Sequence, residues 1–270
     1  MSAATRKRVY ITGGSSGIGL ALACFYAERG DDVILLARDQ VRLDGAVGLC
    51  EARSSRDGQT IAAVALDITV YDRLHAELDE IVAAFGLPDL LILSAGVAIN
   101  KRFLDTPRQE FDWIVDINFA GSREVARCLL PGMLARGSGQ IAFISSSAGL
   151  LGIYGYSAYA ASKFAVTGFV QALRQELAGS GVSVHLVCPP EVDTPMIAAE
   201  SANVLPQTRF LKDLAGTLPP AVAAKKIARG IRKKQAVIVP GVRASVILWC
   251  ARHFQDTFGR LSELLLRWKF

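Results

Sequence analysis

The stretch RVYITGGSSGIGLALACFYAERG, residues 8–30, places a glycine-rich turn between an apolar strand and a helix. The residues Arg8–Thr12 predict a buried strand, and the pattern from Gly17 to Arg29 predicts the helix. Between them the glycines follow the spacing G-x-x-x-G-x-G. Glycines permit a tight turn and close approach of a phosphate group, and the first N–H groups of a helix lack partners within it. The stretch therefore predicts a site for the pyrophosphate of a dinucleotide.

Strand and helix patterns alternate from this stretch almost to the end of the chain. Further strands are expected at Asp32–Ala37, Thr60–Leu66, Asp89–Leu93, Gly139–Ser145, Val182–Cys188 and Ala236–Val239. Helices are expected near residues 40–53, 71–85, 108–136, 159–178 and 220–234. Nearly continuous apolar strands are typical of a sheet buried on both faces. We predict an α/β fold, a Rossmann-type doubly wound parallel sheet of about seven strands with helices on both faces.

The length of the chain, 270 residues, suits one large domain. We predict a single dinucleotide-binding and catalytic domain over residues 1–241 and an amphipathic C-terminal extension over residues 242–270. Residues 193–218 mix Thr, Pro, Asn and Gln with large apolar side chains, and no regular pattern is visible there. A long irregular insertion of this kind predicts a lid over the substrate.

The end of the second strand, Leu35-Leu36-Ala37-Arg38-Asp39, bears on the kind of dinucleotide. In this fold an acid at the strand tip binds the ribose diol of NAD, whereas an arginine accommodates the 2′-phosphate of NADP. Ala37 occupies the tip and Arg38 follows directly. Asp39, one residue further on, is expected to cap the next helix. We therefore predict NADP(H) as the cofactor.

Tyr159 and Lys163 are four residues apart, and Ser146 lies thirteen residues before the tyrosine. On a helix, residues i and i+4 share one face, so the ammonium group can lie beside the phenol and lower its pKa. A serine hydroxyl from a strand end could polarise the same substrate oxygen. Ser145, Ser146 and Ser147 are consecutive, and the spacing favours Ser146 while leaving Ser147 as an alternative. Alone, the tyrosine–lysine spacing is common on solvated helices.

Over residues 6–195 the chain resembles the short-chain dehydrogenase/reductase family. The resemblance rests on TGGSSGIG at 12–19, Asp67, Asn118 in Asp-Ile-Asn-Phe-Ala-Gly, Ser146 and Tyr159-x-x-x-Lys163, in the order and approximate spacing of the family. It implies that Tyr159 donates a proton to a carbonyl oxygen, that Ser146 polarises this oxygen and that Lys163 assists the phenol and binds the nicotinamide ribose. It also implies that Asn118 holds a water linking Lys163 to solvent.

The same resemblance implies which residues contact the cofactor. The adenine half is assigned to Asp67 and Ile68, and Ser15 is placed with Arg38 at the 2′-phosphate. Besides Tyr159 and Lys163, the full set is Gly13, Ser15, Ser16, Gly17, Ile18, Gly19, Arg38, Asp67, Ile68, Ser94, Ala95, Gly96, Pro189, Val192 and Thr194. The chain departs from the family pattern twice, because Ser94 replaces an asparagine and Pro190 replaces a glycine.

The segment Pro-Pro-Glu-Val-Asp-Thr-Pro at 189–195 is similar to one in the 3-ketodihydrosphingosine reductases. In addition, the loop between Ser146 and Tyr159 carries Leu150, Leu151, Ile153, Tyr154 and Tyr156. Both features predict reduction of a ketone on an apolar, long-chain substrate. The alternative for these apolar residues is packing of the lid or of a dimer. Alternatives for the function are a steroid or general carbonyl reductase and, more remotely, a non-catalytic nucleotide-sensing protein.

Composition bears on partners and compartment. The net charge is +5, but no basic stripe is interleaved with aromatic residues, so nucleic acid is not expected as a partner. The five cysteines form no C-x-x-C pair, which indicates a reducing compartment. The N-terminus shows no apolar signal core, so we expect a cytoplasmic protein. The three histidines, His75, His185 and His253, are scattered, and no metal site is expected.

The C-terminal extension combines an apolar run, Val242–Trp249, with aromatic, apolar and basic residues at helical spacing up to Phe270. No uncharged run reaches the roughly 20 residues needed to span a bilayer. The pattern is compatible with an interfacial helix in peripheral contact with the cytosolic face of a membrane. Packing of a helix on the body of the protein or on a partner subunit explains the same pattern and is the simpler interpretation. We also expect a homo-oligomer, either a dimer or a tetramer.

Overall fold

A computed structural model describes residues 6–201 and 203–269. Its main sheet has seven parallel strands in the order β3-β2-β1-β4-β5-β6-β9. The strands are β1 (Arg8–Thr12), β2 (Asp32–Ala37), β3 (Ile61–Ala65), β4 (Leu90–Leu93), β5 (Gly139–Ile144), β6 (Val182–Val187) and β9 (Val237–Ile238). The predicted doubly wound parallel sheet is confirmed. The strand order reverses between β1 and β4, which is where ligands bind in open sheets of this type.

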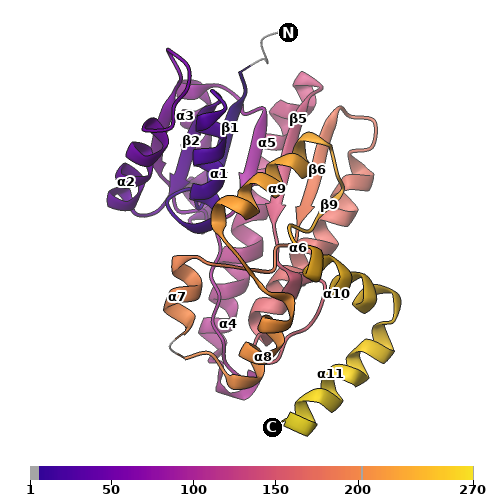
Figure 1. Cartoon of the computed structure of the whole chain (residues 1–270). Coiled ribbons are helices and arrows are strands. Elements are labelled where there is room, and N and C mark those ends of the chain that lie inside the picture. The colour runs from indigo at the N-terminus through magenta and orange to yellow at the C-terminus, as the bar shows by residue number, and fades with distance from the viewer. Residues whose placement is uncertain (1–5, 202, 270) are drawn as a thin grey trace.

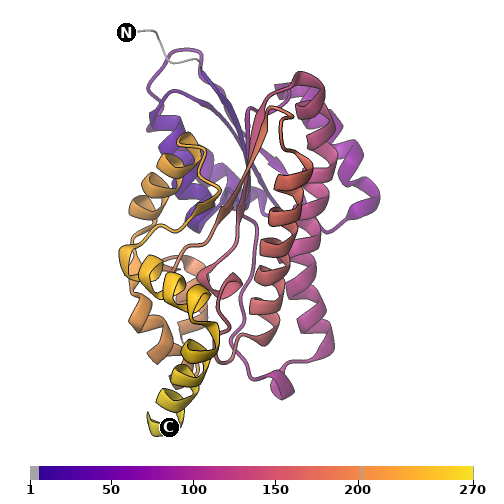
Figure 2. The ribbon, with the colours of Figure 1, turned by 90° about the vertical axis from the view of Figure 1, so that its right-hand side faces the viewer.

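Helices cover both faces of the sheet, and each face has its own apolar core (Figures 1 and 2). On one face lie α1 (Gly17–Glu28), α2 (Gln40–Glu51) and α9 (Pro220–Arg232). The other face carries α3 (Tyr71–Phe85), α4 (Arg108–Val115), α5 (Ser122–Arg136) and α6 (Ser157–Glu176). Strands such as Leu90–Leu93 are buried throughout because both of their faces are covered.

The helical run predicted for residues 108–136 is continuous but not uniform. Between α4 and α5 the backbone forms a π-helical segment, η2 (Asp116–Gly121). Such segments are rare and are frequently found at functional sites. Asn118 lies in its middle and is buried, so the wide turn determines where this side chain points.

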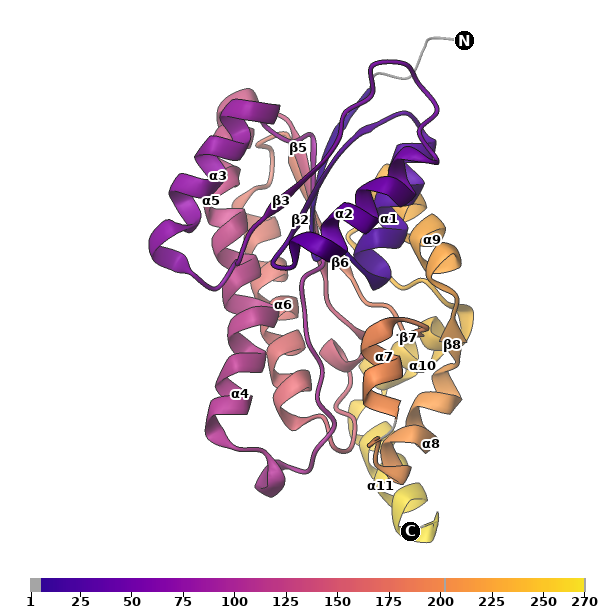
Figure 3. The ribbon, with the colours of Figure 1, turned by 90° about the vertical axis from the view of Figure 1, so that its left-hand side faces the viewer.

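The expectation of an irregular segment at residues 193–218 is wrong. The structure has α7 (Pro195–Ser201), α8 (Pro206–Ala215) and β8 (Thr217–Leu218), and β8 pairs with β7 (Glu191–Val192). Prolines open both helices, and a proline at the first position is compatible with a helix because its missing N–H would have no helical partner there. These short helices lie beyond the C-terminal edge of the main sheet (Figure 3).

The C-terminal extension consists of α10 (Val242–His253) and α11 (Gln255–Lys269). Helix α10 contacts α8 and buries Ala244, Leu248 and Ala251, while α11 extends away from the sheet beside α8 (Figures 1 and 3). The Lys269 ammonium lies 3.9 Å from the Phe210 ring centroid of α8. The extension therefore packs on the body along one face. Within residues 6–201 and 203–269, no helix combines the length and apolar character needed to cross a membrane.

Candidate active site

Two adjoining cavities lie at the C-terminal edge of the sheet, where the strand order reverses. Of the predicted site residues, those lining the first cavity are Gly13, Ser16, Gly17, Ile18, Ser94, Ala95, Gly96, Ser146, Tyr159, Lys163, Pro189, Val192 and Thr194. Those lining only the second are Ser15, Arg38, Asp67 and Ile68. Only Gly19 and Asn118 line neither of these two cavities. The fold thus brings most of the predicted set together at one place.

The glycine turn fits the close approach of a ligand. Gly13 and Gly17 have φ of +66° and +54°, a conformation that other residues adopt only with strain. A Cβ at Gly13 would lie 2.8 Å from the backbone of Ala95. Gly19 supports the turn from behind, because a Cβ there would lie 2.2 Å from the Gly13 carbonyl oxygen. Its contact with the cofactor stays a prediction.

The loop after β4 is held by Thr12, a residue that sequence analysis did not single out. Its Oγ1 accepts hydrogen bonds from the backbone N–H of Ser94 at 3.1 Å and of Ala95 at 3.3 Å. The threonine belongs to the quoted turn, but only the pairing of β1 with β4 brings it beside this loop. The loop is thus anchored although Ser94 replaces the asparagine of the family pattern.

Asn118 anchors the next residues of the same loop. Its Oδ1 accepts from the Val97 N–H at 2.8 Å, and its Nδ2 donates to Val97 O and to Ser162 Oγ, both at 2.9 Å. Both side-chain donor hydrogens therefore have partners. The structure gives the side chain a positioning role, and the water predicted at this residue stays a prediction.

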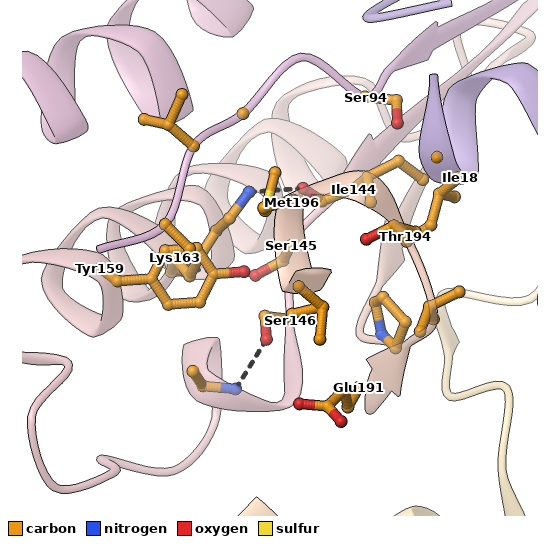
Figure 4. A pocket seen from close by; sticks show the side chains of 18 of the residues that line it. Ile18, Ser94, Ile144, Ser145, Ser146, Tyr159, Lys163, Glu191, Thr194 and Met196 are labelled. Atoms are coloured by element: carbon orange, nitrogen blue, oxygen red, sulfur yellow. Dashed lines mark hydrogen bonds between the residues drawn. The ribbon is translucent and has the colours of Figure 1, made fainter. Parts of the chain in front are cut away.

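Tyr159 and Lys163 extend from α6 into the first cavity, with Ser146 opposite (Figure 4). The Lys163 Nζ donates to the Ile144 carbonyl oxygen at 3.0 Å and lies 5.7 Å from the Tyr159 ring centroid. Ser145 is turned away, because its hydroxyl donates to the Lys163 carbonyl oxygen at 3.1 Å. Ser146 lines the cavity with Tyr159, and its Oγ accepts from the Ala148 N–H at 3.1 Å. This geometry favours Ser146 over Ser145, while Ser147 lines the same cavity and stays the alternative.

Burial is the main cause of the pKa shifts of Tyr159 and Lys163. It raises the pKa of Tyr159 to about 12, although the nearby Ser146 hydroxyl acts in the opposite direction. It also lowers the pKa of Lys163 to about 8. Both shifts disfavour the charged form, as expected for groups removed from water. The simple expectation that the lysine lowers the phenol pKa is therefore not met by these side chains alone.

The second cavity has a volume of about 600 Å³, which is in the range of ligand-binding clefts. Arg38 is exposed on its wall and, among the described residues, has no hydrogen-bond or ion-pair partner. Asp39 caps α2 as predicted, because its side chain accepts from the Arg42 N–H at 3.1 Å. Arg42 also lines this cavity and was missed in the sequence. The glycine cradle and these two arginines fit a dinucleotide that carries an additional phosphate.

A buried polar cluster on the lid was not predicted. We use the term lid cluster for Tyr156, Glu191, Glu200 and Lys212, whose ion pairs and hydrogen bonds join the loop before α6 to α7 and α8. Three of its members line the first cavity, and Glu200 lines the second. In the sequence Tyr156 and Glu191 belong to the loop and the segment described above, but no spacing links them to Glu200 and Lys212, so no local pattern could have revealed the cluster.

The fold and the site define a dinucleotide-dependent oxidoreductase with a tyrosine, a lysine and a serine in one cavity. A family model described as short chain dehydrogenase matches residues 7–204. The chain belongs to the short-chain dehydrogenase/reductase family, as its sequence motifs predicted.

Relatives and solved structures agree with this assignment. The chain is 38% identical to the 3-dehydrosphinganine reductase TSC10B of Arabidopsis thaliana, over 98% of this chain and 83% of that protein. It is 32% identical to the 3-ketodihydrosphingosine reductase of Bos taurus, over 82% and 67% respectively. A short-chain dehydrogenase from Sphingobium yanoikuyae in complex with NADPH has a TM-score of 0.77 at 26% identity, covering 96% of this chain and 95% of that one. One from Burkholderia phymatum in complex with NAD has the same fold, with a TM-score of 0.82 at 24% identity and coverage of 95% and 96%.

Replacing Lys163 by Met should change how stability depends on pH. The lysine pKa falls from 10.5 to about 8 on burial, so between these values the unfolded chain binds more protons than the folded one. The free energy of unfolding of the wild type should therefore rise above pH 8 relative to Lys163→Met, with a slope of at most about 1.4 kcal/mol per pH unit. Urea unfolding from about pH 7 to about pH 10 measures this difference.

The Lys225→Met variant, which removes an exposed lysine of α9, is the matched control for the loss of a solvated charge. A constant difference between wild type and Lys163→Met across this range would show that folding does not lower the pKa of Lys163.

Proposed function

We propose that the protein is an NADPH-dependent reductase of a ketone on an apolar, long-chain substrate, similar to 3-ketodihydrosphingosine. The observation that carries the proposal is the meeting of Tyr159 and Ser146 in a cavity that adjoins the arginine-lined one. The dinucleotide would extend along the glycine turn from Arg38 to the tyrosine.

In this proposal a bound nicotinamide cofactor supplies the hydride. Tyr159 donates the proton to the ketone oxygen, and Ser146 donates a hydrogen bond that polarises the carbonyl. Because burial raises the pKa of Tyr159 to about 12, the phenol is held in its protonated form, as a proton donor requires. Lys163 is fixed by its hydrogen bond to the Ile144 carbonyl oxygen, and its ammonium group would bind the ribose hydroxyls of the cofactor.

The choice of substrate is supported by the names of the two relatives and by the apolar wall of the first cavity. That wall includes Ala98, Ile153, Val192, Met196 and Ile197. These side chains favour an alkyl chain next to the ketone. A steroid or general carbonyl reductase with the same catalytic residues is the second candidate, because a flat apolar ring system would contact the same side chains.

Tyr159→Phe should lower the rate of NADPH oxidation with 3-ketodihydrosphingosine by roughly a hundredfold to ten-thousandfold, since the proton donor is lost. Absorbance of NADPH measures the rate, and steroid ketones and short ketones in the same assay test the second candidate. Tyr154→Phe is the matched control, because it removes a partly exposed hydroxyl from the neighbouring loop. Undiminished turnover in Tyr159→Phe would contradict the mechanism, and binding of NADPH without turnover of any ketone would favour a nucleotide sensor.

Arg38→Ala should weaken NADPH binding by roughly tenfold to a hundredfold, because one charge-assisted hydrogen bond to the 2′-phosphate is lost. NADH binding should change much less, since NADH lacks this phosphate. Titration of each cofactor by calorimetry measures both affinities. Arg53→Ala at the far end of α2, outside both cavities, is the control. An unchanged NADPH affinity in Arg38→Ala would refute the assignment.

We also propose peripheral membrane contact through the unburied face of the C-terminal extension. Its exposed side chains include Val242, Val246 and Trp249 on α10 and Leu264 and Trp268 on α11. Replacing Trp249 and Trp268 by Ser should lower co-flotation with anionic liposomes several-fold, while Val41→Ser on α2 should not. Equal co-flotation of the wild type and all variants with the liposomes would contradict the proposal. The predicted homo-oligomer and the cytoplasmic location stay predictions.

A further inference from the structure

The lid cluster is built around the ammonium group of Lys212. Its Nζ lies 2.5 Å from Glu191 Oε2 and 3.1 Å from Glu200 Oε2. It also donates to the Tyr156 hydroxyl at 3.2 Å, and this hydroxyl in turn donates to Glu200 Oε2 at 2.5 Å. The side chains of Glu191, Glu200 and Lys212 are 4%, 5% and 8% exposed. Burying three charged groups is expensive, so each should find partners for all its polar atoms.

One atom of the cluster lacks a partner. Glu200 Oε1 is buried, and no donor among residues 6–201 and 203–269 reaches it. Glu191 differs, because its Oε2 forms the ion pair with Lys212 and its Oε1 accepts from Thr217 Oγ1 at 2.8 Å. Glu200 Oε1 can therefore accept one further hydrogen bond.

The unpartnered atom is a carboxylate oxygen, which favours a cationic donor. Glu191 contacts two cations, Lys212 at 2.5 Å and Arg209 at 3.3 Å. The ion pair of Glu200 is with Lys212, which it shares with Glu191. An ammonium group at Glu200 Oε1 would give this oxygen a charged partner.

The cluster stands beside the reacting groups. The rings of Tyr156 and Tyr159 are 5.2 Å apart between centroids, and Glu191 lines the same cavity as Ser146 and Tyr159 (Figure 4). Met196, one helical turn before Glu200 on α7, lines both cavities. A ligand whose ketone oxygen meets Tyr159 can therefore present its neighbouring atoms to the cluster.

We propose that the lid cluster is the subsite for an ammonium group on the carbon adjacent to the reacting carbonyl, with Glu200 as its anionic partner. This inference rests on the proposed function, and it assigns the residues that would bind the amine of such a substrate. In 3-ketodihydrosphingosine the amine occupies this adjacent carbon, and a terminal hydroxyl follows it. Burial makes the charge-assisted contact selective, because an analogue without the amine would leave Glu200 Oε1 without a hydrogen-bond donor.

The test compares the wild type with the Glu200→Gln variant on two substrates. Steady-state kinetics with NADPH would use 3-ketodihydrosphingosine and the same ketone with hydrogen in place of the amine. Glu200→Gln keeps the size of the side chain and its contacts with Tyr156 and Lys212, but removes the charge. We expect kcat/KM for the amino ketone to fall roughly tenfold to a hundredfold, and that for the ketone without the amine to change less than about threefold. Asp213→Asn, on the exposed side of α8, is the matched control and should leave both values unchanged.

Two outcomes would overturn the subsite. An equal loss on both substrates would show that the cluster merely holds the lid closed, and no loss on either would show that Glu200 does not contact the substrate. If the wild type reduces neither ketone, the proposed function fails. The subsite is then decided by calorimetry of the protein with bound NADP⁺, comparing sphinganine with the corresponding diol that lacks the amine. A preference for the amine that Glu200→Gln abolishes would support the subsite, and equal binding would refute it.

Discussion

The close packing of the glycine turn against the loop after β4 is the constraint on which the site depends. A Cβ at Gly13 would lie 2.8 Å from the backbone of Ala95, and Thr12 Oγ1 accepts hydrogen bonds from two N–H groups of that loop. These contacts exist because β1 and β4 are neighbours across the point where the strand order reverses. The cofactor cleft and the catalytic cavity open side by side for the same reason.

The catalytic side chains are held by buried polar contacts that leave little freedom. Asn118, in the π-helical segment, fixes the backbone of Val97 on one side and Ser162 of the catalytic helix on the other. Ser145 donates to the Lys163 carbonyl oxygen, so the serine beside Ser146 orients α6 rather than the substrate. A catalytic group is effective only when its geometry is fixed in advance, and these neighbours provide that geometry.

Some features could be predicted from the sequence because they depend on short segments. The alternation of apolar strands and helices predicted the sheet, and the capping role of Asp39 followed from its place at the start of a helix. The helical structure of the predicted lid, residues 193–218, could not be predicted in this way. Its helices α7 and α8 are short, begin at prolines and lack a long apolar stripe, and the buried contacts of Asn100 with Gly155, Leu205 and Thr208 tie them to distant loops.

The sequence by itself determined the fold class, the dinucleotide turn and the tyrosine–lysine pair, because each depends on patterns that lie within single strands, turns or helices. Only the tertiary structure decided that Gly19 supports the turn from behind, that Asn118 anchors the loop after β4, and that Glu191 and Glu200 both contact the ammonium group of Lys212. These contacts join residues from separate elements, and the spacing of two residues along the chain does not tell how close they lie in the folded protein. The physical reason is burial. A charged side chain is stable away from water only where other elements of the fold supply its hydrogen-bond and ion-pair partners.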